Sequence, residues 1–263
     1  MVFIRNQKKN VSLHFKQGKA MQAFIPAAGL GTRLRPLTDH CPKAMIEIDG
    51  VPLLKIAIDN LIRQGISRIV VNVHHFPDMI IDYIVSHTWE VPISISDERD
   101  LLLDTGGGLK KASSLMADDE PVLIHNVDVL STIDLNQLLS LHKEKNDLAT
   151  MAVSERKTSR YLLFDQQDKL TGWANTTSGE TKWVSAPATQ CKQFAFSGIA
   201  IVEPTFLSQM PVADKPYPII PVYLEMAKSN RISYFQHSSN AWFDVGTPQK
   251  LDAAKQWYHS LQK

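Results

Sequence analysis

The chain has 263 residues, 44% of them hydrophobic and 21% charged, with a formal net charge of +1 at pH 7. A balance this close to neutral gives no long-range field toward nucleic acid or an anionic membrane, so any anion site must be local. The length fits one large α/β domain or two small ones, and no apolar run reaches the ~20 residues that span a bilayer. Two cysteines without metal-ligand spacing, and no secretion signal, favour a reducing cytoplasm.

The first twenty residues differ from the rest of the chain. Residues 1–20 are basic and weakly patterned, and they lack the apolar stretch of a signal peptide. We interpret them as an N-terminal extension outside the core, and residues 21–263 as a single domain. The alternative for residues 1–20 is a peripheral strand or an oligomer contact.

A short apolar strand is predicted at residues 23–25, and a run of small residues follows it. Small residues let backbone N–H groups approach a ligand without side chains in the way. Two arginines and a lysine come next, and backbone donors beside fixed positive charge suit a polyphosphate. The predicted phosphate contacts are Ala27, Ala28, Gly29, Gly31, Thr32, Arg33 and Lys43.

This loop matches neither of the two common phosphate-binding motifs. A Walker loop needs Lys and then Ser or Thr directly after its second glycine, but Thr32 and Arg33 follow Gly31. The dinucleotide fingerprint needs a third glycine three residues after the second, and that position is Leu34. The alternative without a ligand is a tight turn with solvated basic residues.

Strands and helices then alternate along the chain. Strands are predicted at 44–48, 68–73 and 93–96, with helices at 53–64 and 77–85 between them. The near-continuous apolar run at 68–73 is typical of a strand buried on both faces. Alternation at this spacing predicts a doubly wound, mainly parallel sheet.

A second glycine-rich segment covers residues 103–109, with a helix predicted at 110–115. Three consecutive glycines are entropically costly and need a reason. A flexible linker is one reason, but linkers are longer and polar. A loop whose backbone lies against a flat ligand is the other, and it is favoured because a helix begins just after it. The predicted contacts are Thr105, Gly106, Gly107 and Gly108.

Two aspartates are candidate metal ligands. Asp128 follows a predicted strand at 121–126, and ligands in open α/β sheets bind at the carboxyl ends of strands. A carboxylate beside a polyphosphate site is a natural ligand for Mg²⁺, although Asp128 could instead cap the turn before Ser131. Asp244 is the second candidate, before a Gly-Thr-Pro turn in which Thr247 caps the final helix.

In the second half of the chain, the predicted alternation of strands and helices is interrupted by a segment of short antiparallel strands. A helix at 133–145 and a strand at 149–153 come first, and residues 154–193 then read as short antiparallel hairpins that form a separate lobe. After this lobe the predicted elements are a strand at 196–202, helices at 205–209 and 219–229, a strand at 232–235 and a helix at 249–262.

The first loop resembles that of the sugar-1-phosphate nucleotidyltransferases, which read Gly-x-Gly-Thr-Arg-Leu, then a Pro and a Thr, then Pro-Lys. Every one of those positions is filled here. The chain also resembles the N-acetylmuramate-1-phosphate uridylyltransferases and mannose-1-phosphate guanylyltransferase-like proteins within that family. That likeness rests on the first loop and on residues 105–108, 196–199 and 244–247.

The resemblance implies a Rossmann-like doubly wound mixed sheet of the nucleotide-diphospho-sugar transferase (GT-A-like) type, with the 154–193 lobe on the sugar side. It implies an Mg²⁺-dependent enzyme, a monomer or homodimer, that joins UTP or GTP to a sugar 1-phosphate, such as N-acetylmuramate 1-phosphate, and releases pyrophosphate. Carried over, residues 106–108 contact the nucleobase, and Asp128 and Asp244 bind Mg²⁺. The predicted catalytic residues Arg33 and Lys43 follow from their own chemistry, since Arg33 suits the leaving pyrophosphate and Lys43 suits the α-phosphate or the attacking phosphate. The sugar contacts are Asn126, Gly198 and Trp242.

Two positions depart from the family pattern. Val127 replaces the usual glycine between Asn126 and Asp128, which puts a side chain near the sugar or ribose. The usual Glu-Lys-Pro, whose lysine holds the sugar phosphate, is absent from the region 154–160. Arg156, Lys157 or Arg160 could substitute, and the sequence does not choose among them.

Other functions compete with this one. Mannose-1-phosphate guanylyltransferase is the alternative within the family. A glycosyltransferase that uses a nucleotide sugar could read residues 126–128 as a variant Asp-x-Asp motif, but it leaves residues 29–43 unexplained. A non-catalytic relative that only binds nucleotide is disfavoured because Arg33, Lys43, Asp128 and Asp244 are all present.

Overall fold

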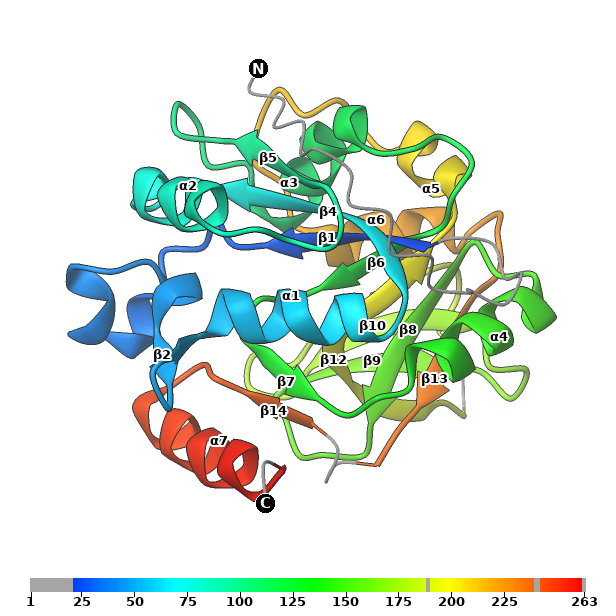
Figure 1. The fold of residues 1–263 in the computed structure, drawn as a ribbon. Coiled ribbons are helices and arrows are strands. Elements are labelled where there is room, and N and C mark those ends of the chain that lie inside the picture. Colours follow the sequence, from blue (N-terminus) through cyan, green and yellow to red (C-terminus); the bar gives the residue numbers. More distant parts are fainter. Residues whose placement is uncertain (1–20, 188–189, 239–241, 262–263) are drawn as a thin grey trace.

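The computed structural model describes residues 21–187, 190–238 and 242–261. A mixed sheet runs through the centre of the molecule (Figure 1). Its parallel part has the order β6-β1-β4-β5, and the expected doubly wound arrangement is confirmed. These strands are β1 (Met21–Pro26), β4 (Ile66–Val73), β5 (Ile93–Asp97) and β6 (Val122–His125).

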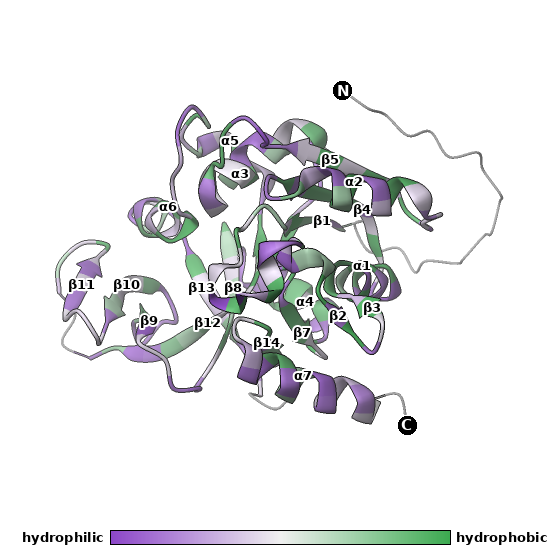
Figure 2. Ribbon diagram, turned by 90° about the vertical axis from the view of Figure 1, so that its left-hand side faces the viewer, coloured by the Kyte–Doolittle hydropathy of each residue, from purple (hydrophilic) through white to green (hydrophobic). Residues whose placement is uncertain are grey.

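The sheet becomes antiparallel beyond β6. The long strand β12 (Lys192–Val202) runs antiparallel to both β6 and β8 (Ala149–Ser154), and β13 (Ile232–Gln236) pairs in parallel with β8. At its start β12 continues into the predicted hairpins, β9 (Arg160–Phe164), β10 (Leu170–Asn175) and β11 (Glu180–Trp183). Figure 2 shows these three strands set to one side of the central sheet.

Helices cover both faces of the sheet because successive strand residues point to opposite sides. Phe24 and Val70 pack with helices α3 (Asp104–Ala112), α5 (Pro204–Gln209) and α6 (Ile219–Met226). Their neighbours Ile25 and Val71 pack with helices α1 (Leu53–Arg63), α2 (Pro77–Ser86) and α4 (Leu135–Lys145). The result is a three-layer sandwich with two apolar cores.

A smaller third core holds the C-terminal segment against the first loop. Strand β7 (Val129–Ser131) pairs with β14 (Trp242–Asp244), and helix α7 (Pro248–Leu261) follows (Figure 1). Leu34 of the first loop, Leu130, Val245 and Leu251 are all buried in this core. The end of the chain is thereby packed beside the predicted phosphate loop.

Two local predictions are wrong. Residues 44–48 were expected as one strand, but Lys43–Met45 forms a 3-10 turn, and a two-residue strand β2 (Glu47–Ile48) then pairs with β3 (Val51–Pro52). The glycines at 106–108 were expected in a loop before a helix, but they lie inside α3. The helix accepts them because they are buried against neighbours that leave no room for a Cβ.

The predicted extension at residues 1–20 lies outside the described residues. Within the described part of the chain, none of the helices is both long and apolar enough to cross a membrane.

Candidate active site

The loop after β1 is held at both ends by polar side chains. The buried Asn72 on β4 accepts hydrogen bonds through Oδ1 from the amides of Ala27, at 2.7 Å, and Ala28, at 3.3 Å. Gly31 has a positive φ of 62°, and its carbonyl accepts a hydrogen bond from Thr38 Oγ1 at 2.9 Å. A Cβ on Gly31 would lie 2.8 Å from the Thr38 methyl group, so glycine is required there.

The middle of this loop is open to ligand. Gly29 and Thr32 are exposed, and no atom lies within 4 Å of the place where a Cβ of Gly29 would sit. Arg33 is also exposed, whereas the partly buried Lys43 forms an ion pair with the Asp128 carboxylate. The exposed predicted contacts Gly29, Thr32 and Arg33 therefore follow the carboxyl end of β1, whereas Ala27 and Ala28 are buried. Lys43 links this loop to the first predicted metal ligand.

The β7–β14 pairing brings the two predicted metal ligands together. Asp244 pairs with Val129, the residue after Asp128, and the amide of Val245 donates to the Asp128 carbonyl at 2.8 Å. Asp128 and Asp244 are therefore diagonal neighbours on adjacent chain segments. The two residues are therefore close in the folded chain although they lie far apart in the sequence.

Gly246 connects Asp244 to the phosphate loop. A Cβ at this position would lie 2.7 Å from Asp244 Oδ1 and 3.4 Å from Arg33 Nη2. Arg33 and the Asp244 carboxylate thus approach the same small space, which glycine leaves unfilled. Lys250 on α7 adds another cation, with its Nζ 2.5 Å from Asp244 Oδ2. Thr247 caps α7 as expected, since its Oγ1 accepts from the Lys250 amide at 3.4 Å.

The two carboxylates fit a divalent cation whose remaining coordination positions are filled by water and by phosphate oxygens of a substrate. Among the described residues no three His, Cys, Asp or Glu side chains gather into a preformed metal cage. Mg²⁺ commonly takes one or two carboxylates and fills its other positions with water and phosphate oxygens. Asp128 and Asp244, which form ion pairs with Lys43 and Lys250, are two such carboxylates beside the predicted phosphate loop, and their role as metal ligands stays a prediction.

The three predicted sugar contacts lie together on the other side of Asp128. Gly198 has a positive φ of 72°, and its carbonyl accepts a hydrogen bond from the amide of Asn126 at 2.9 Å. A Cβ on Gly198 would lie 2.6 Å from Asn126 Nδ2. Trp242 is buried, and its Nε1 donates to the Ser197 carbonyl at 2.7 Å. Asn126 and Gly198 therefore form one tight corner, with Trp242 behind it.

Of the three basic residues left open by the sequence, Arg156 lies beside this corner. Its guanidinium carbon is 4.4 Å from the Trp242 ring centroid, and Nη2 donates to the Phe196 carbonyl at 2.6 Å. Burial lowers the pKa of Arg156, and the negative charge of Asp244 partly offsets this. Arg156 and Lys157 line a small pocket together with Asp244 and Lys250, whereas Arg160 is exposed on β9.

Val127 does not crowd the site. The side chain is 5% exposed and belongs to the same apolar core as Ile25 and Ile133. The valine that replaces the usual glycine therefore packs into the protein interior.

A family model described as nucleotidyl transferase matches residues 22–260. The chain belongs to the nucleotidyl transferase family, a family of enzymes. It is 30% identical to the N-acetylmuramate alpha-1-phosphate uridylyltransferase of Caulobacter vibrioides over 89% of this chain and 95% of that protein. It is 28% identical to the mannose-1-phosphate guanylyltransferase catalytic subunit beta of Dictyostelium discoideum, over 87% of this chain and 62% of that longer protein.

Solved structures share the fold of this nucleotidyl transferase. HddC from Yersinia pseudotuberculosis superposes with a TM-score of 0.70 at 20% identity, covering 90% of this chain and 99% of that one. A UDP-glucose pyrophosphorylase complexed with UDP-glucose gives 0.71 at 18% identity, covering 92% and 99%. These TM-scores show the nucleotide-diphospho-sugar transferase fold that the family resemblance implied.

The glycines of α3 in this nucleotidyl transferase have a packing role that the sequence did not reveal. Gly106 and Gly107 donate their amides to the Tyr217 carbonyl at 2.9 and 3.2 Å, and a Cβ on Gly106 would lie 2.6 Å from the Tyr217 ring. Thr105 is exposed at the start of the helix, and its Oγ1 accepts from the Ile219 amide at 3.0 Å. Contact of residues 105–108 with a nucleobase stays a prediction.

Sequence reasoning missed Asn72, Lys250 and Tyr217. Asn72 carried a signal, because it is a polar residue inside an otherwise apolar predicted strand. Lys250 and Tyr217 carried none, since each reaches the site only through the packing of its helix or loop.

His125 is the last residue of β6 and directly precedes Asn126 of the predicted sugar corner. It is 1% exposed, and its Nε2 has no hydrogen-bond partner in the described structure. Burial lowers the pKa of His125 to about 4, so the ring is neutral at pH 7. A neutral ring leaves the charge balance of the site to its lysines, arginines and aspartates.

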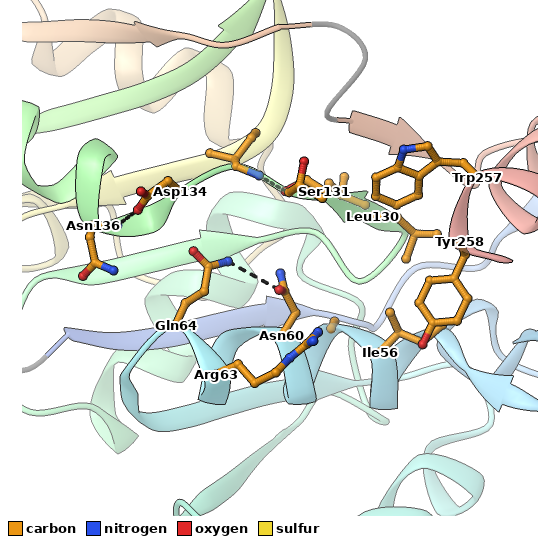
Figure 3. Close-up of a pocket in the computed structure, with 14 residues that line it drawn as sticks. Ile56, Asn60, Arg63, Gln64, Leu130, Ser131, Asp134, Asn136, Trp257 and Tyr258 are labelled. Carbon is orange, nitrogen blue, oxygen red and sulfur yellow. Dashed lines mark hydrogen bonds between the residues drawn. The ribbon is translucent and has the colours of Figure 1, made fainter. Parts of the chain in front are cut away.

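A larger pocket of about 450 Å³ lies away from these residues, between α1, β7 and α7. Figure 3 shows Asn60 and Arg63 of α1 facing Trp257 and Tyr258 of α7 across it. None of the predicted site residues lines this pocket.

Proposed function

We propose that this nucleotidyl transferase joins a nucleoside triphosphate, UTP or GTP, to a sugar 1-phosphate and releases pyrophosphate. The observation that carries the proposal is the meeting of Asp128 and Asp244 beside the arginine-bearing loop. The reaction needs no protein nucleophile. An oxygen of the sugar phosphate attacks the α-phosphorus in line, and the bond to the pyrophosphate oxygen breaks.

The first loop suits the leaving group. Amides of the open segment 29–32 and the exposed Arg33 guanidinium can bind pyrophosphate oxygens, which would stabilise the charge that develops on them. Lys43 lies deeper, next to Asp128, and is placed to contact the α-phosphate or the attacking phosphate. These residues position the reacting groups and neutralise their charge.

Asp128 and Asp244 would hold Mg²⁺. When bound, the ion offsets negative charge on the α-phosphate and makes it a better electrophile. Lys43 and Lys250 pair with these carboxylates and would rearrange toward phosphate oxygens as the ion binds.

We assign the sugar to the corner of Asn126, Gly198 and Trp242, and its phosphate to Arg156. The Arg156 guanidinium lies over Trp242 and lines the same small pocket as Asp244, so it is placed to contact a phosphate bound next to the metal. The lobe at 154–193 would cover this side, and residues 105–108 would contact the nucleobase. We further propose that the protein is a cytoplasmic monomer or homodimer that acts on these substrates alone.

N-acetylmuramate 1-phosphate with UTP is our first substrate pair. The Caulobacter vibrioides uridylyltransferase supports it, because the similarity extends over 95% of that protein. Mannose 1-phosphate with GTP is the second pair, supported by guanylyltransferases that the chain matches over 62% of their length.

The test is a matrix of reactions. The protein is incubated with Mg²⁺, each nucleoside triphosphate and each of several sugar 1-phosphates, and pyrophosphate is measured. We expect pyrophosphate from one triphosphate and one or a few sugars, and its formation to be about 100-fold slower or more in an Asp244→Asn variant. Transfer of sugar from a nucleotide sugar to an acceptor, without pyrophosphate from any pair, would instead support the glycosyltransferase alternative.

A further inference from the structure

Asn72 and Glu98 form a buried polar connection between the two halves of the proposed nucleotide site. Asn72 on β4 is 3% exposed and Glu98, just after β5, is 0% exposed. Asn72 Nδ2 donates to Glu98 Oε1 at 2.7 Å. Buried polar groups are costly unless they are hydrogen-bonded, and an ionisable carboxylate that is 0% exposed is especially costly, so this pair needs a reason.

Each residue of the pair holds one segment of the site. On one side, Asn72 Oδ1 accepts from the amides of Ala27 and Ala28, at the start of the phosphate loop. On the other side, Glu98 Oε2 accepts from the amide of Leu103 at 3.0 Å, the residue before helix α3. Two segments far apart in sequence are thus joined through two side chains.

Helix α3 also packs closely against the Asn72 and Glu98 side chains. A Cβ on Gly108 would lie 2.7 Å from Asn72 Nδ2 and 2.7 Å from Glu98 Oε1. The third glycine of the run therefore allows α3 to approach the hydrogen bond between the two side chains. This explains one of the three glycines without a ligand, and it fixes α3 relative to the phosphate loop.

The donors of this hydrogen-bond chain point inward from both ends and converge on Glu98. Backbone amides enter at both ends, and the Asn72 amide group is the one element between them that both accepts and donates. Glu98 accepts through two different oxygens, which a carboxylate provides and a carboxamide, with a single oxygen, does not. A glutamine at position 98 would place an N–H group against either the Leu103 amide or Asn72 Nδ2.

We propose that Asn72 and Glu98 are positioning residues, which set the phosphate loop and the start of α3 in the relative orientation that nucleoside triphosphate binding requires. The inference rests on the proposed function, in which the loop contacts the phosphates and α3 contacts the base. Neither side chain touches the substrate in this account.

The hydrogen-bond pattern can be rebuilt with the charge on the other residue. In the double variant Asn72→Asp with Glu98→Gln, the new aspartate accepts from Ala27 and Ala28 and from the glutamine amide, and the glutamine oxygen accepts from Leu103. The single variant Glu98→Gln leaves two donors face to face. The single variant Asn72→Asp places two carboxylates face to face. The double variant is therefore the matched control for both singles.

The test measures the affinity for UTP and for GTP, each with Mg²⁺, by calorimetry, and in parallel the thermal unfolding midpoint and the KM for the sugar 1-phosphate. We expect each single variant to lose about tenfold in affinity for the accepted triphosphate, as one mismatched buried hydrogen bond implies, and the double variant to recover to within about threefold. The KM for the sugar phosphate should change much less.

The outcomes separate the two proposals. If the unmodified protein binds neither triphosphate, the proposed function fails, and the inference fails with it. If it binds one and Glu98→Gln binds it equally well, the inference alone is overturned. Recovery of the unfolding midpoint in the double variant without recovery of triphosphate affinity shows a purely structural pair and also overturns it. If the single variants do not fold, the double variant must both fold and bind, and failure of either contradicts the inference.

Discussion

The main-chain carbonyl of Asp128 accepts a hydrogen bond from the amide of Val245 over 2.8 Å. This contact directly follows the short β7–β14 ladder, which joins the middle of the chain to its C-terminal segment. Because Asp244 precedes Val245, the same ladder places a second carboxylate beside the first. The proposed cation site therefore depends on a pairing of three residues on each strand, supported by the small core around Leu130 and Val245.

Replacement of either aspartate should affect catalysis much more than folding. We expect Asp128→Asn and Asp244→Asn each to lower kcat by about 100-fold or more, because a carboxamide is a poor ligand for Mg²⁺. The free energy of unfolding should change by no more than about 1 kcal/mol, since both side chains are partly exposed. Steady-state kinetics and urea unfolding check this.

The control for the aspartates is Asp252→Asn, an exposed carboxylate on α7. It should leave both kcat and stability unchanged. An unchanged kcat in Asp128→Asn or Asp244→Asn would remove that residue from the metal site.

Arg156 and Arg160 provide a matched pair for the sugar phosphate. Arg156→Ala should raise the KM for the sugar 1-phosphate by about tenfold or more, because a charge-assisted contact with phosphate is lost. The KM for the triphosphate should stay nearly constant. Arg160→Ala removes an exposed guanidinium on β9 and should change neither value. Equal effects of the two substitutions on the KM for the sugar 1-phosphate would contradict a specific contact between Arg156 and the sugar phosphate.

Gly198 and Gly179 share a positive φ, 72° and 74°, but differ in their surroundings. No atom lies within 4 Å of a Cβ on Gly179, whereas a Cβ on Gly198 would lie 2.6 Å from Asn126 Nδ2. Gly179→Ala should cost about 1 kcal/mol of unfolding free energy from backbone conformation alone. Gly198→Ala should cost at least about 1 kcal/mol more and should raise the KM for the sugar phosphate.

Chemical unfolding of the two alanine variants under one set of conditions measures the difference directly. A Gly198→Ala variant as stable as Gly179→Ala would mean that the Asn126 side chain moves aside at little cost. The corner would then be less rigid than the structure indicates.

His125 should make the protein sensitive to acid. Its pKa in the folded state, about 4, is below the ordinary value of 6.5, so the unfolded state binds the extra proton between these pH values. This contribution to stability is complete above about pH 6.5 and is lost as the pH falls toward 4, by about 3 kcal/mol in total.

The variant His125→Leu places an apolar side chain at this buried position and removes the titratable group. We expect its unfolding free energy to fall less steeply than that of the unmodified protein between pH 6.5 and pH 4. Parallel curves for the two proteins over this range would contradict the assignment to His125.

Much of the architecture follows from local pattern. The alternation of apolar strands with amphipathic helices predicted the doubly wound sheet, and turn-rich sequence at 154–193 predicted its hairpins. The strand at 44–48 was wrong because its apolar residues satisfy a 3-10 turn and a buried corner equally well. A short run of apolar residues therefore predicts that a segment is buried more reliably than it predicts whether the segment is a strand or a turn.

The candidate site was predictable where a residue acts through its own chemistry. Arg33, Lys43, Asp128 and Asp244 could be selected because charge beside small residues suits phosphate and metal. The connection through Asn72 and the packing of Gly106–108 against Tyr217 and Glu98 could not, because they depend on which distant segments meet in the folded chain.

The most direct test of the shared cation site is a crystal structure with Mn²⁺ in place of Mg²⁺ and the nucleotide sugar identified by the reaction matrix. The anomalous signal of Mn²⁺ locates the ion independently of the refined protein. The account predicts one peak bound by both Asp128 and Asp244, on the side that faces Arg33. A peak bound elsewhere, or one that touches neither carboxylate while the nucleotide sugar is bound, would contradict it.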